Sequence, residues 1–231
     1  MKTIGILGGM SWESTQSCYA GLNRGVAARL GGLHSAKVLV HSVDFAEIEA
    51  LQRSGEWRLA GERLAHAAQG LEAAGADFVM LATNTMHKVA GAIGSALTVP
   101  FLHIATPTGR RLSQDGVRRV GLLGTRFTMQ ERFYREVLER EFELDVLVPD
   151  TPNIAELDRI IFDELCHGEL HERSRRCFVE AIEALAARGA QGVILGCTEI
   201  GLLVTPPDTG VALYDTTRLH VEAAVEYALA E

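Results

Sequence analysis

The chain has 231 residues, 47% of them hydrophobic, and a formal net charge of −8, and this length suffices for one large core or two domains of about a hundred residues each. The acidic balance, the scattered arginines and the lack of a long apolar run exclude a nucleic-acid or membrane partner, so we expect a cytoplasmic protein. Its four cysteines form no C-x-x-C pair and are expected to stay outside disulfides.

Short apolar runs alternate with amphipathic stretches along the chain, a pattern typical of βαβ units and parallel sheets. In the first half we predict strands at 2–8, 36–43 and 78–82 and helices at 13–30 and 57–74. In the second half we predict strands at 119–124, 144–148 and 192–196 and helices at 130–141, 154–165 and 174–188. Residues 100–107 are the predicted crossover, and the tail after Asp215 is predicted to form a helix that packs on the first lobe.

Two stretches of the chain read as copies of each other. GADFVMLATNT at 75–85 matches GAQGVILGCTE at 189–199 with an offset of 114, and this offset aligns Thr83 with Cys197. Upstream, IGILGG at 4–9 matches VGLLGT at 120–125 with an offset of 116. A glycine that ends a helix opens each copy of the longer match. The pattern predicts a duplicated half-protein.

We therefore predict an α/β fold with two similar lobes, each a mainly parallel sheet flanked by helices, related by pseudo-two-fold symmetry. The first lobe is predicted to hold residues 1–99 and 214–231, and the second residues 100–213. Two copies that face each other would place Thr83 and Cys197 on opposite walls of one cleft. Proton chemistry at both faces of a carbon requires such an arrangement.

Cys197 is the first candidate for chemistry, because ligands of parallel sheets bind at the carboxyl ends of the strands. A thiol has a pKa of about 8.5, which a helix N-terminus can lower further, and this would make Cys197 a usable base. The alternative is a cysteine that only fills space in the core. Cys18, Cys166 and Cys177 lie in helical stretches, Cys166 at the end of the predicted helix 154–165, and we interpret them as structural.

The glycine-rich opening GILGGM lacks the dinucleotide fingerprint, because Leu7 occupies the position of its second glycine. Two interpretations stay open: Gly8 and Gly9 let backbone amides approach an anion, with a hydroxyl from Ser11 at the helix start, or they form a plain tight turn. The segment HGELH at 167–171 has two histidines four residues apart, but Gly168 weakens the helix that a metal site would need. We predict no metal there.

Three motifs carry a family resemblance over nearly the whole chain. They are GILGGMSWEST at the N-terminus, ATNTMH at 82–87 and GCTEI at 196–200. With these motifs in this order, the sequence resembles the aspartate/glutamate racemase family, and GCTE is similar to its aspartate racemase branch. The resemblance implies cofactor-independent racemisation of an acidic amino acid by two facing cysteines, in a homodimer. No cofactor is expected.

Thr83 stands where the family has its first cysteine. A hydroxyl is a far weaker base than a thiolate, so symmetrical two-thiol chemistry is not expected. The pair is similar to a Thr/Cys branch specific for L-aspartate and L-glutamate. On that resemblance, Cys197 abstracts the α-proton of the L-enantiomer and Thr83 serves the opposite face. Any preference between enantiomers must be kinetic, because enantiomers have equal free energy in water.

The substrate is expected to be held by polar groups at the strand ends. Backbone amides with Asn84, Thr85 and Thr198 would hold the α-carboxylate as negative charge develops. The resemblance places a basic residue against the distal carboxylate, and Arg53, in a loop with Gln52, is the candidate; a solvated surface arginine is the alternative. Glu199 and His87 either tune the thiol and the hydroxyl or serve as structural hydrogen-bonding residues. The predicted substrate-binding set is Met10, Ser11, Gln52, Arg53, Asn84, Thr85, Thr198 and Glu199.

Two other functions stay open at this stage. Arylmalonate decarboxylases are relatives that keep only the second cysteine, although an aryl group would suit a less polar segment than TNT. A binding protein that closes on an acidic amino acid without turnover is the third possibility. The substrate also stays open between aspartate and glutamate, because the segment 166–168 has no lysine where aspartate racemases tend to have one.

Overall fold

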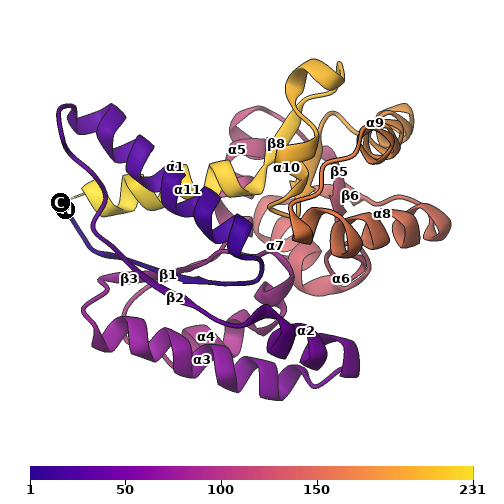
Figure 1. The fold of residues 1–231 in the computed structure, drawn as a ribbon. Coiled ribbons are helices and arrows are strands. Elements are labelled where there is room, and N and C mark those ends of the chain that lie inside the picture. Colours follow the sequence, from indigo (N-terminus) through magenta and orange to yellow (C-terminus); the bar gives the residue numbers. More distant parts are fainter. Residues whose placement is uncertain (231) are drawn as a thin grey trace. The chain divides into compact units, whose positions relative to one another are not determined.

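A computed structural model describes residues 1–230 and divides the chain into two compact units. Unit 1 comprises Met1–Ile104 and His220–Glu231, and unit 2 comprises Ala105–Leu219. Each unit is built on one parallel four-stranded sheet with helices packed on it (Figure 1). The predicted α/β class, with two similar halves that each contain a parallel sheet, is confirmed.

The sheet of unit 1 has the strand order β2-β1-β3-β4. Its central strands are buried along their whole length, as expected of apolar runs covered by helices on both faces. The strands are β1 (Ile4–Gly8), β2 (Val38–Ser42), β3 (Phe78–Leu81) and β4 (Phe101–Leu102). The helices are α1 (Trp12–Leu30), α2 (Phe45–Ser54), α3 (Trp57–Ala73) and α4 (Ala90–Ser95), with the 3₁₀ helix η1 (Thr85–Val89).

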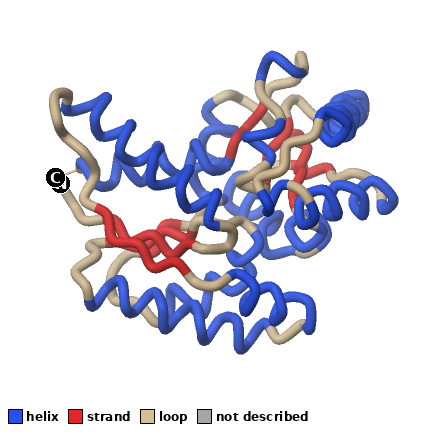
Figure 2. Tube along the Cα trace, in the orientation of Figure 1, coloured by secondary structure: helices blue, strands red, loops and turns tan. Residues whose placement is uncertain are grey.

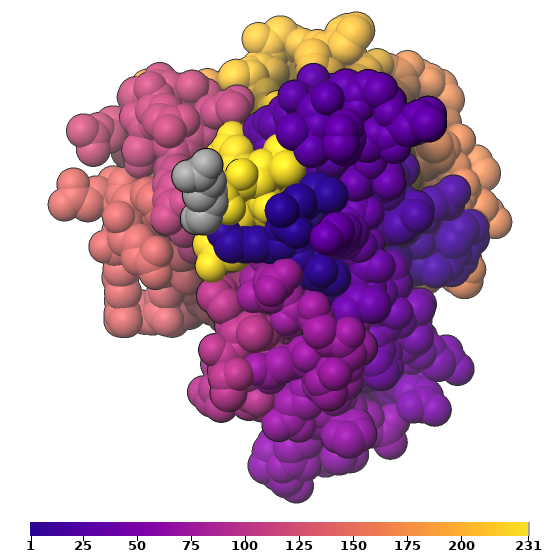
Figure 3. All heavy atoms as spheres, turned by 90° about the vertical axis from the view of Figure 1, so that its left-hand side faces the viewer, coloured from indigo at the N-terminus to yellow at the C-terminus, as the bar shows by residue number. Residues whose placement is uncertain are grey.

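The last helix, α11 (Thr216–Leu229), belongs to the core of unit 1 for most of its length. Its apolar residues pack with α1 on one face of the sheet, while α3 covers the other face (Figure 2). Gly21 and Gly25 of α1 permit this close packing, because a Cβ there would lie 3.1 and 2.9 Å from the side chains of Val221 and Val225. Figure 3 shows the end of α11 beside the first residues of the chain, where Lys2 N donates to the Ala228 carbonyl at 2.8 Å. The prediction that the tail forms a helix packed on the first half is confirmed.

The sheet of unit 2 repeats the same topology in the order β6-β5-β7-β8. Its strands are β5 (Arg119–Gly124), β6 (Asp145–Leu147), β7 (Val193–Gly196) and β8 (Leu213–Asp215). Its longer helices are α5 (Ala105–Gln114), α7 (Arg132–Phe142), α8 (Thr151–Asp163) and α9 (Glu172–Ala187). The shorter ones are α6 (Arg126–Gln130), η2 (Leu165–His167), α10 (Ile200–Leu203) and η3 (Pro206–Asp208).

The two units also repeat each other in local detail. Gly75 and Gly189 end α3 and α9 with φ of +98° and +95°, a left-handed conformation that glycine adopts without strain. In both places the residue after the glycine donates a backbone hydrogen bond to the last turn of the helix. Ala76 N donates to Leu71 O and Ala190 N donates to Leu185 O, each at 3.1 Å. The predicted duplication and its two helix-ending glycines are confirmed.

The structure adds elements that the pattern did not predict. The chain passes from unit 1 to unit 2 between Ile104 and Ala105, inside the crossover predicted at 100–107, and this stretch also contains β4 and the first residues of α5. Strand β4 is only two residues long, too short to show an alternation in the sequence. Helices α2, α4 and α5 and strand β8 were likewise not predicted. Among residues 1–230, no helix has both the length and the apolarity needed to cross a bilayer.

Candidate functional site

Polar side chains follow the same strand in each sheet. β3 and β7 hold equivalent places in their sheets, and Thr83 and Cys197 lie within two residues of their carboxyl ends. Both side chains are buried, with Thr83 and Cys197 each 7% exposed. Asn84 and Thr85 continue the first loop and Thr198 and Glu199 the second, and all four are also buried. Each unit thus presents a short buried polar loop at one strand end.

The Cys197 thiol is held by the carboxylate of Glu199. Its Sγ donates to Glu199 Oε2 at 2.9 Å, and the Thr198 hydroxyl donates to the same oxygen at 2.7 Å. Burial raises the pKa of Cys197 well above its ordinary value, and the negative charge of Glu199 raises it further. The expectation that a helix N-terminus lowers this pKa is therefore wrong. Helix α10 has only four residues, and its dipole cannot offset burial beside a carboxylate.

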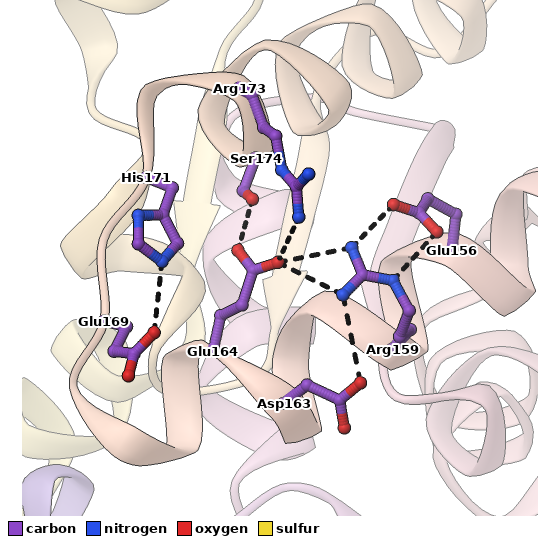
Figure 4. Close-up of polar contacts among 8 residues, drawn as sticks. All are labelled: Glu156, Arg159, Asp163, Glu164, Glu169, His171, Arg173 and Ser174. Atoms are coloured by element: carbon purple, nitrogen blue, oxygen red, sulfur yellow. Dashed lines mark hydrogen bonds and ion pairs between the residues drawn. The ribbon is translucent and has the colours of Figure 1, made fainter.

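A second buried carboxylate anchors the segment that follows α8. Glu164 is 5% exposed, and its side chain accepts hydrogen bonds from Arg159 at 3.2 Å, from Arg173 at 3.3 Å and from the Ser174 hydroxyl (Figure 4). Burial would raise the pKa of Glu164, but the bonds from these three side chains outweigh burial and lower it. The Glu164 carbonyl also accepts from His167 N at 3.0 Å. The start of segment 165–171 is therefore fixed by both backbone and side-chain bonds.

This segment brings a second cysteine close to the first. Cys166 packs against the hydrophobic cluster that contains Cys197, and its charge would raise the pKa of the Cys197 thiol further. All four cysteines of the chain are thiols outside disulfides, as predicted. Cys18 lies in the core of unit 1, in agreement with its structural interpretation. Cys166, in contrast, belongs to the surroundings of the candidate site.

Thr83 is held through its backbone by His87. His87 Nδ1 lies 2.7 Å from the Thr83 carbonyl, and His87 Nε2 accepts from Ile104 N at 3.1 Å. Since a carbonyl oxygen only accepts, Nδ1 carries the proton, and the ring is the neutral Nδ1–H tautomer. Burial lowers the pKa of His87 well below its ordinary value, in agreement with this neutral state. The imidazole is 3% exposed.

Gln52 and Arg53 lie in helix α2 and not in a loop, which corrects the prediction for their backbone. Gln52 is 4% exposed, and its Nε2 lies 2.9 Å from the sulfur of Met86, in the helical turn that follows Thr83. The Arg53 side chain is 77% exposed and pairs with Glu49 at 2.6 Å. In unit 1, Gln52 therefore contacts the Thr83 segment, while Arg53 is a solvent-facing cation with an acidic partner on its own helix.

The opening loop has the structure of a tight turn. Gly9 has φ of +93°, and a Cβ there would lie 2.2 Å from the carbonyl oxygen of Val43. Gly9 N donates to the Thr15 hydroxyl at 2.8 Å, so this amide already has a partner within the protein. Ser11 caps α1 by accepting from Ser14 N at 3.4 Å. The turn interpretation of Gly9 is favoured over anion binding, and the buried Met10 and Ser11 line the turn.

The two histidines of HGELH do not share a helix face. His167 ends η2, Gly168 follows with φ of +74°, and His171 precedes α9 and pairs with Glu169 at 3.1 Å. His171 and Glu169 are both exposed (Figure 4). Over the part of the chain that the structure describes, no three His, Cys, Asp or Glu residues gather to hold a metal ion.

The site residues are thus distributed over two separate units. Unit 1 holds Met10, Ser11, Gln52, Arg53, Thr83, Asn84 and Thr85, and unit 2 holds Cys197, Thr198 and Glu199. Sequence reasoning did not identify Ile104 and Glu164, which fix the loops that follow β3 and α8. A signal for Glu164 was present in the arginines at 173, 175 and 176, which follow it in the chain and could supply partners for its carboxylate. Ile104 acts through its backbone amide and leaves no signal.

The fold and the site define a class: a duplicated α/β protein with a hydroxyl and a thiol at equivalent strand ends. The chain belongs to the Asp/Glu/Hydantoin racemase family, whose model matches residues 7–224. The predicted resemblance to aspartate/glutamate racemases is confirmed.

The similarity extends to solved structures over the full chain. A proposed Asp/Glu racemase from Yersinia pestis is 48% identical with a TM-score of 0.92, and both chains are covered completely. An aspartate racemase homologue from Pyrococcus horikoshii OT3 is 33% identical with a TM-score of 0.84, again over 100% of both chains. The broad specificity amino-acid racemase RacX of Bacillus subtilis (strain 168) is 39% identical over 69 residues, a match that spans 30% of this chain and 30% of that protein. Family and neighbours together support an amino acid racemase, which is an isomerase.

Proposed function

We propose that the protein is a cofactor-independent racemase of aspartate, glutamate or both, with Cys197 and Thr83 as its two proton-transferring groups. The observation that carries the proposal is their equivalence: each follows the third strand in the order of two copies of one sheet. The names of the Yersinia pestis and Pyrococcus horikoshii OT3 relatives support an acidic amino acid as substrate. The part-length match to RacX leaves room for a broader substrate range.

Racemisation requires groups on opposite faces of the α-carbon. In our proposal Thr83 serves one face of the α-carbon and Cys197 the other. Asn84, Thr85 and Thr198 hold the α-carboxylate, where negative charge grows as the α-proton leaves. Fixed hydrogen-bond donors at this position lower the barrier because they need no reorganisation when the charge develops.

The resting thiol needs a proton acceptor before it can act as a base. Glu199 is in place for this role, since its Oε2 already accepts the Sγ–H bond at 2.9 Å. Glu199 takes the thiol proton, and the thiolate removes the α-proton of the L-enantiomer. Thr83 gives its hydroxyl proton to the opposite face, and solvent carries the proton from Glu199 to the Thr83 oxygen. Every proton is accounted for, and no cofactor takes part.

The two directions differ in which group must remove the proton. From the L-enantiomer the base is a thiolate, and from the D-enantiomer it is a hydroxyl oxygen, which is far less ready to lose its own proton. The preference for the L-enantiomer is therefore kinetic. The value of kcat/KM for the L-enantiomer must equal that for the D-enantiomer, because the two enantiomers are equally stable in water.

The decisive experiment follows L-glutamate and L-aspartate in deuterated water by NMR and chiral chromatography. The wild-type protein is expected to put deuterium on the α-carbon and to form the D-enantiomer, and Cys197→Ala is expected to do neither. Cys177→Ala, which removes a half-buried thiol of α9, is the matched control and should behave like the wild type. Binding without exchange would contradict the racemase and favour the binding protein, and carbon dioxide release from an arylmalonate would favour the decarboxylase.

A homodimer in the cytoplasm, which the family resemblance implies, stays a prediction of this proposal. Light scattering on the purified protein measures the mass directly. A mass of twice the 25.1 kDa chain is expected, and a mass equal to one chain would contradict the dimer.

A further inference from the structure

Two buried histidines, His87 and His220, and the half-buried His103 lie close to one another in unit 1. The ring of His87 lies 4.5 Å from that of His103 and 6.3 Å from that of His220, measured between centroids. His220 is fully buried, and its Nε2 lies 2.8 Å from the Leu102 carbonyl, to which it donates. Burial lowers the pKa of His103 and of His220 to about 4, so the cluster is neutral at physiological pH.

The cluster lies where the chain leaves unit 1 and returns to it. Unit 1 ends at Ile104, whose amide is bound by His87, and it resumes at His220, which binds the Leu102 carbonyl. The two hydrogen bonds thus fix neighbouring residues of one connecting segment. Through the ring of His87, that segment is tied to the carbonyl of Thr83.

In unit 2 the position equivalent to His87 holds no imidazole. The offset of 114 that aligns Thr83 with Cys197 aligns His87 with Gly201. A Cβ at Gly201 would lie 2.6 Å from Asp215 Oδ2, so a carboxylate occupies the space of a side chain there. The Cys197 carbonyl accepts instead from Ile200 N at 3.1 Å, three residues along the same loop, and the Cys197 thiol donates to Glu199. The imidazole is therefore a feature of the Thr83 loop and not of the shared scaffold.

We propose that His87 is a positioning residue for Thr83, whose carbonyl it ties to the backbone amide of Ile104. A hydroxyl that must deliver a proton to one face of a carbon tolerates little displacement, because misplacement by about 1 Å can cost up to about 100-fold in rate. His87 does not touch the substrate in this account. It fixes the backbone from which the Thr83 hydroxyl projects.

This role of His87 rests on the proposed racemase activity. Two variants separate its hydrogen bond to Thr83 from its hydrogen bond to Ile104. His87→Asn keeps an amide NH₂ near the place of Nδ1 and retains the donor to Thr83. His87→Gln places its amide near Nε2, retains the acceptor for Ile104 and loses the donor to Thr83. His220→Phe is the matched control, because it removes a buried imidazole and its bond to Leu102 from the same cluster but leaves the bond to Thr83 in place.

The measured quantity is the amount of D-product formed per α-deuterium exchanged into the remaining L-substrate. Exchange back into the L-enantiomer needs only Cys197, whereas inversion also needs Thr83, so a general loss of stability leaves the ratio unchanged. His87→Gln is expected to lower the ratio about 10- to 100-fold. His87→Asn, which keeps the donor to Thr83 but loses the acceptor for Ile104, is expected to lower it less, and His220→Phe is expected to stay close to the wild type. An unchanged ratio in His87→Gln, or an equal fall in His220→Phe, would overturn the proposal.

A spectroscopic test does not depend on turnover. Nitrogen-15 NMR of the histidine rings is expected to show His87 with a protonated Nδ1 and an unprotonated Nε2 at neutral pH. The opposite tautomer, or an imidazolium, would contradict the proposed hydrogen bonds of His87 to Thr83 and Ile104 even in an active enzyme. If the wild type neither exchanges nor inverts the acidic amino acids, the proposed function fails, and the ring spectrum still decides whether His87 holds Thr83.

Discussion

The loop after β3 and the loop after β7 occupy the same place in two copies of one sheet, but different chemistry holds them. Glu199 holds the Cys197 loop from within, and its carboxylate keeps the thiol protonated. His87 holds the Thr83 loop through a hydrogen bond to the backbone carbonyl of Thr83, not to its hydroxyl. The comparison shows that a duplicated scaffold can keep the position of two reacting groups while the means of tuning each group diverges.

Loss of the thiol is the largest change that the comparison predicts. Cys197→Ala removes the only group of the proposed pair that can act as a base on the L-enantiomer. Racemisation is expected to fall by a factor of about 100 to 10,000, the usual contribution of a general acid or base. Chiral chromatography of product from L-glutamate measures the loss. Activity within a few-fold of the wild type would mean that another group removes the proton.

A second thiol would make the two strand ends alike. Thr83→Cys replaces a hydroxyl by a group whose pKa lies far closer to neutrality, so proton removal from the D-enantiomer is expected to accelerate by about tenfold or more. Initial rates from D-glutamate and L-glutamate measure this, and both values of kcat/KM must rise together. Thr83→Ser, which keeps the hydroxyl, is the control and should stay near the wild type. A fall in both directions for Thr83→Cys would contradict the role of Thr83 as the weaker base.

The pKa of the thiol tests how Glu199 tunes Cys197. Glu199→Gln removes the negative charge beside Sγ, so the pKa of Cys197 is expected to fall, although burial keeps it raised. The rate of alkylation by iodoacetamide as a function of pH follows the thiolate, and its midpoint should move to lower pH. Racemisation should fall at the same time, because the thiol loses its proton acceptor. A midpoint that does not move would show that Glu199 does not control the thiol.

Acid should weaken unit 1 through its buried histidines. Burial holds the pKa of His220 at about 4 against about 6.5 in an unfolded chain, so the unfolded state binds more protons between these values. The stability from the neutral ring is complete above about pH 6.5 and is lost as the pH falls towards 4. For His220 this loss amounts to about 2 kcal/mol between pH 7 and 5. Urea unfolding at both pH values measures it, and His220→Phe should reduce the difference; an equal difference in the variant would contradict the assignment.

The sequence predicted the parts of the fold that depend on local pattern. The buried runs of β1, β3, β5 and β7 are apolar, and Gly75 and Gly189 end their helices as expected because only glycine adopts this conformation freely. Strand β4 has two residues and gives no pattern to detect. Helix α2 was not predicted. Gln52 and Arg53 lie in this helix, so their interpretation as loop residues was wrong.

Local pattern could not predict how the site is tuned. The direction of the Cys197 pKa shift depends on the burial of the thiol and on the contact of the Glu199 side chain with it, neither of which a motif reveals. The cluster of His87 with His220 joins residues 133 positions apart in the chain. Such contacts arise only when the sheet brings distant segments together. The residue types at the site were therefore predictable, and their protonation states were not.

The most direct measurement of the asymmetry uses Thr83→Ala and starts separately from each enantiomer of glutamate in deuterated water. The variant keeps Cys197 and Glu199 and loses only the hydroxyl. We predict that L-glutamate still gains α-deuterium without forming D-glutamate, while D-glutamate gains none. Equal exchange into both enantiomers, or continued inversion, would contradict the assignment of Thr83 and Cys197 to opposite faces of the substrate.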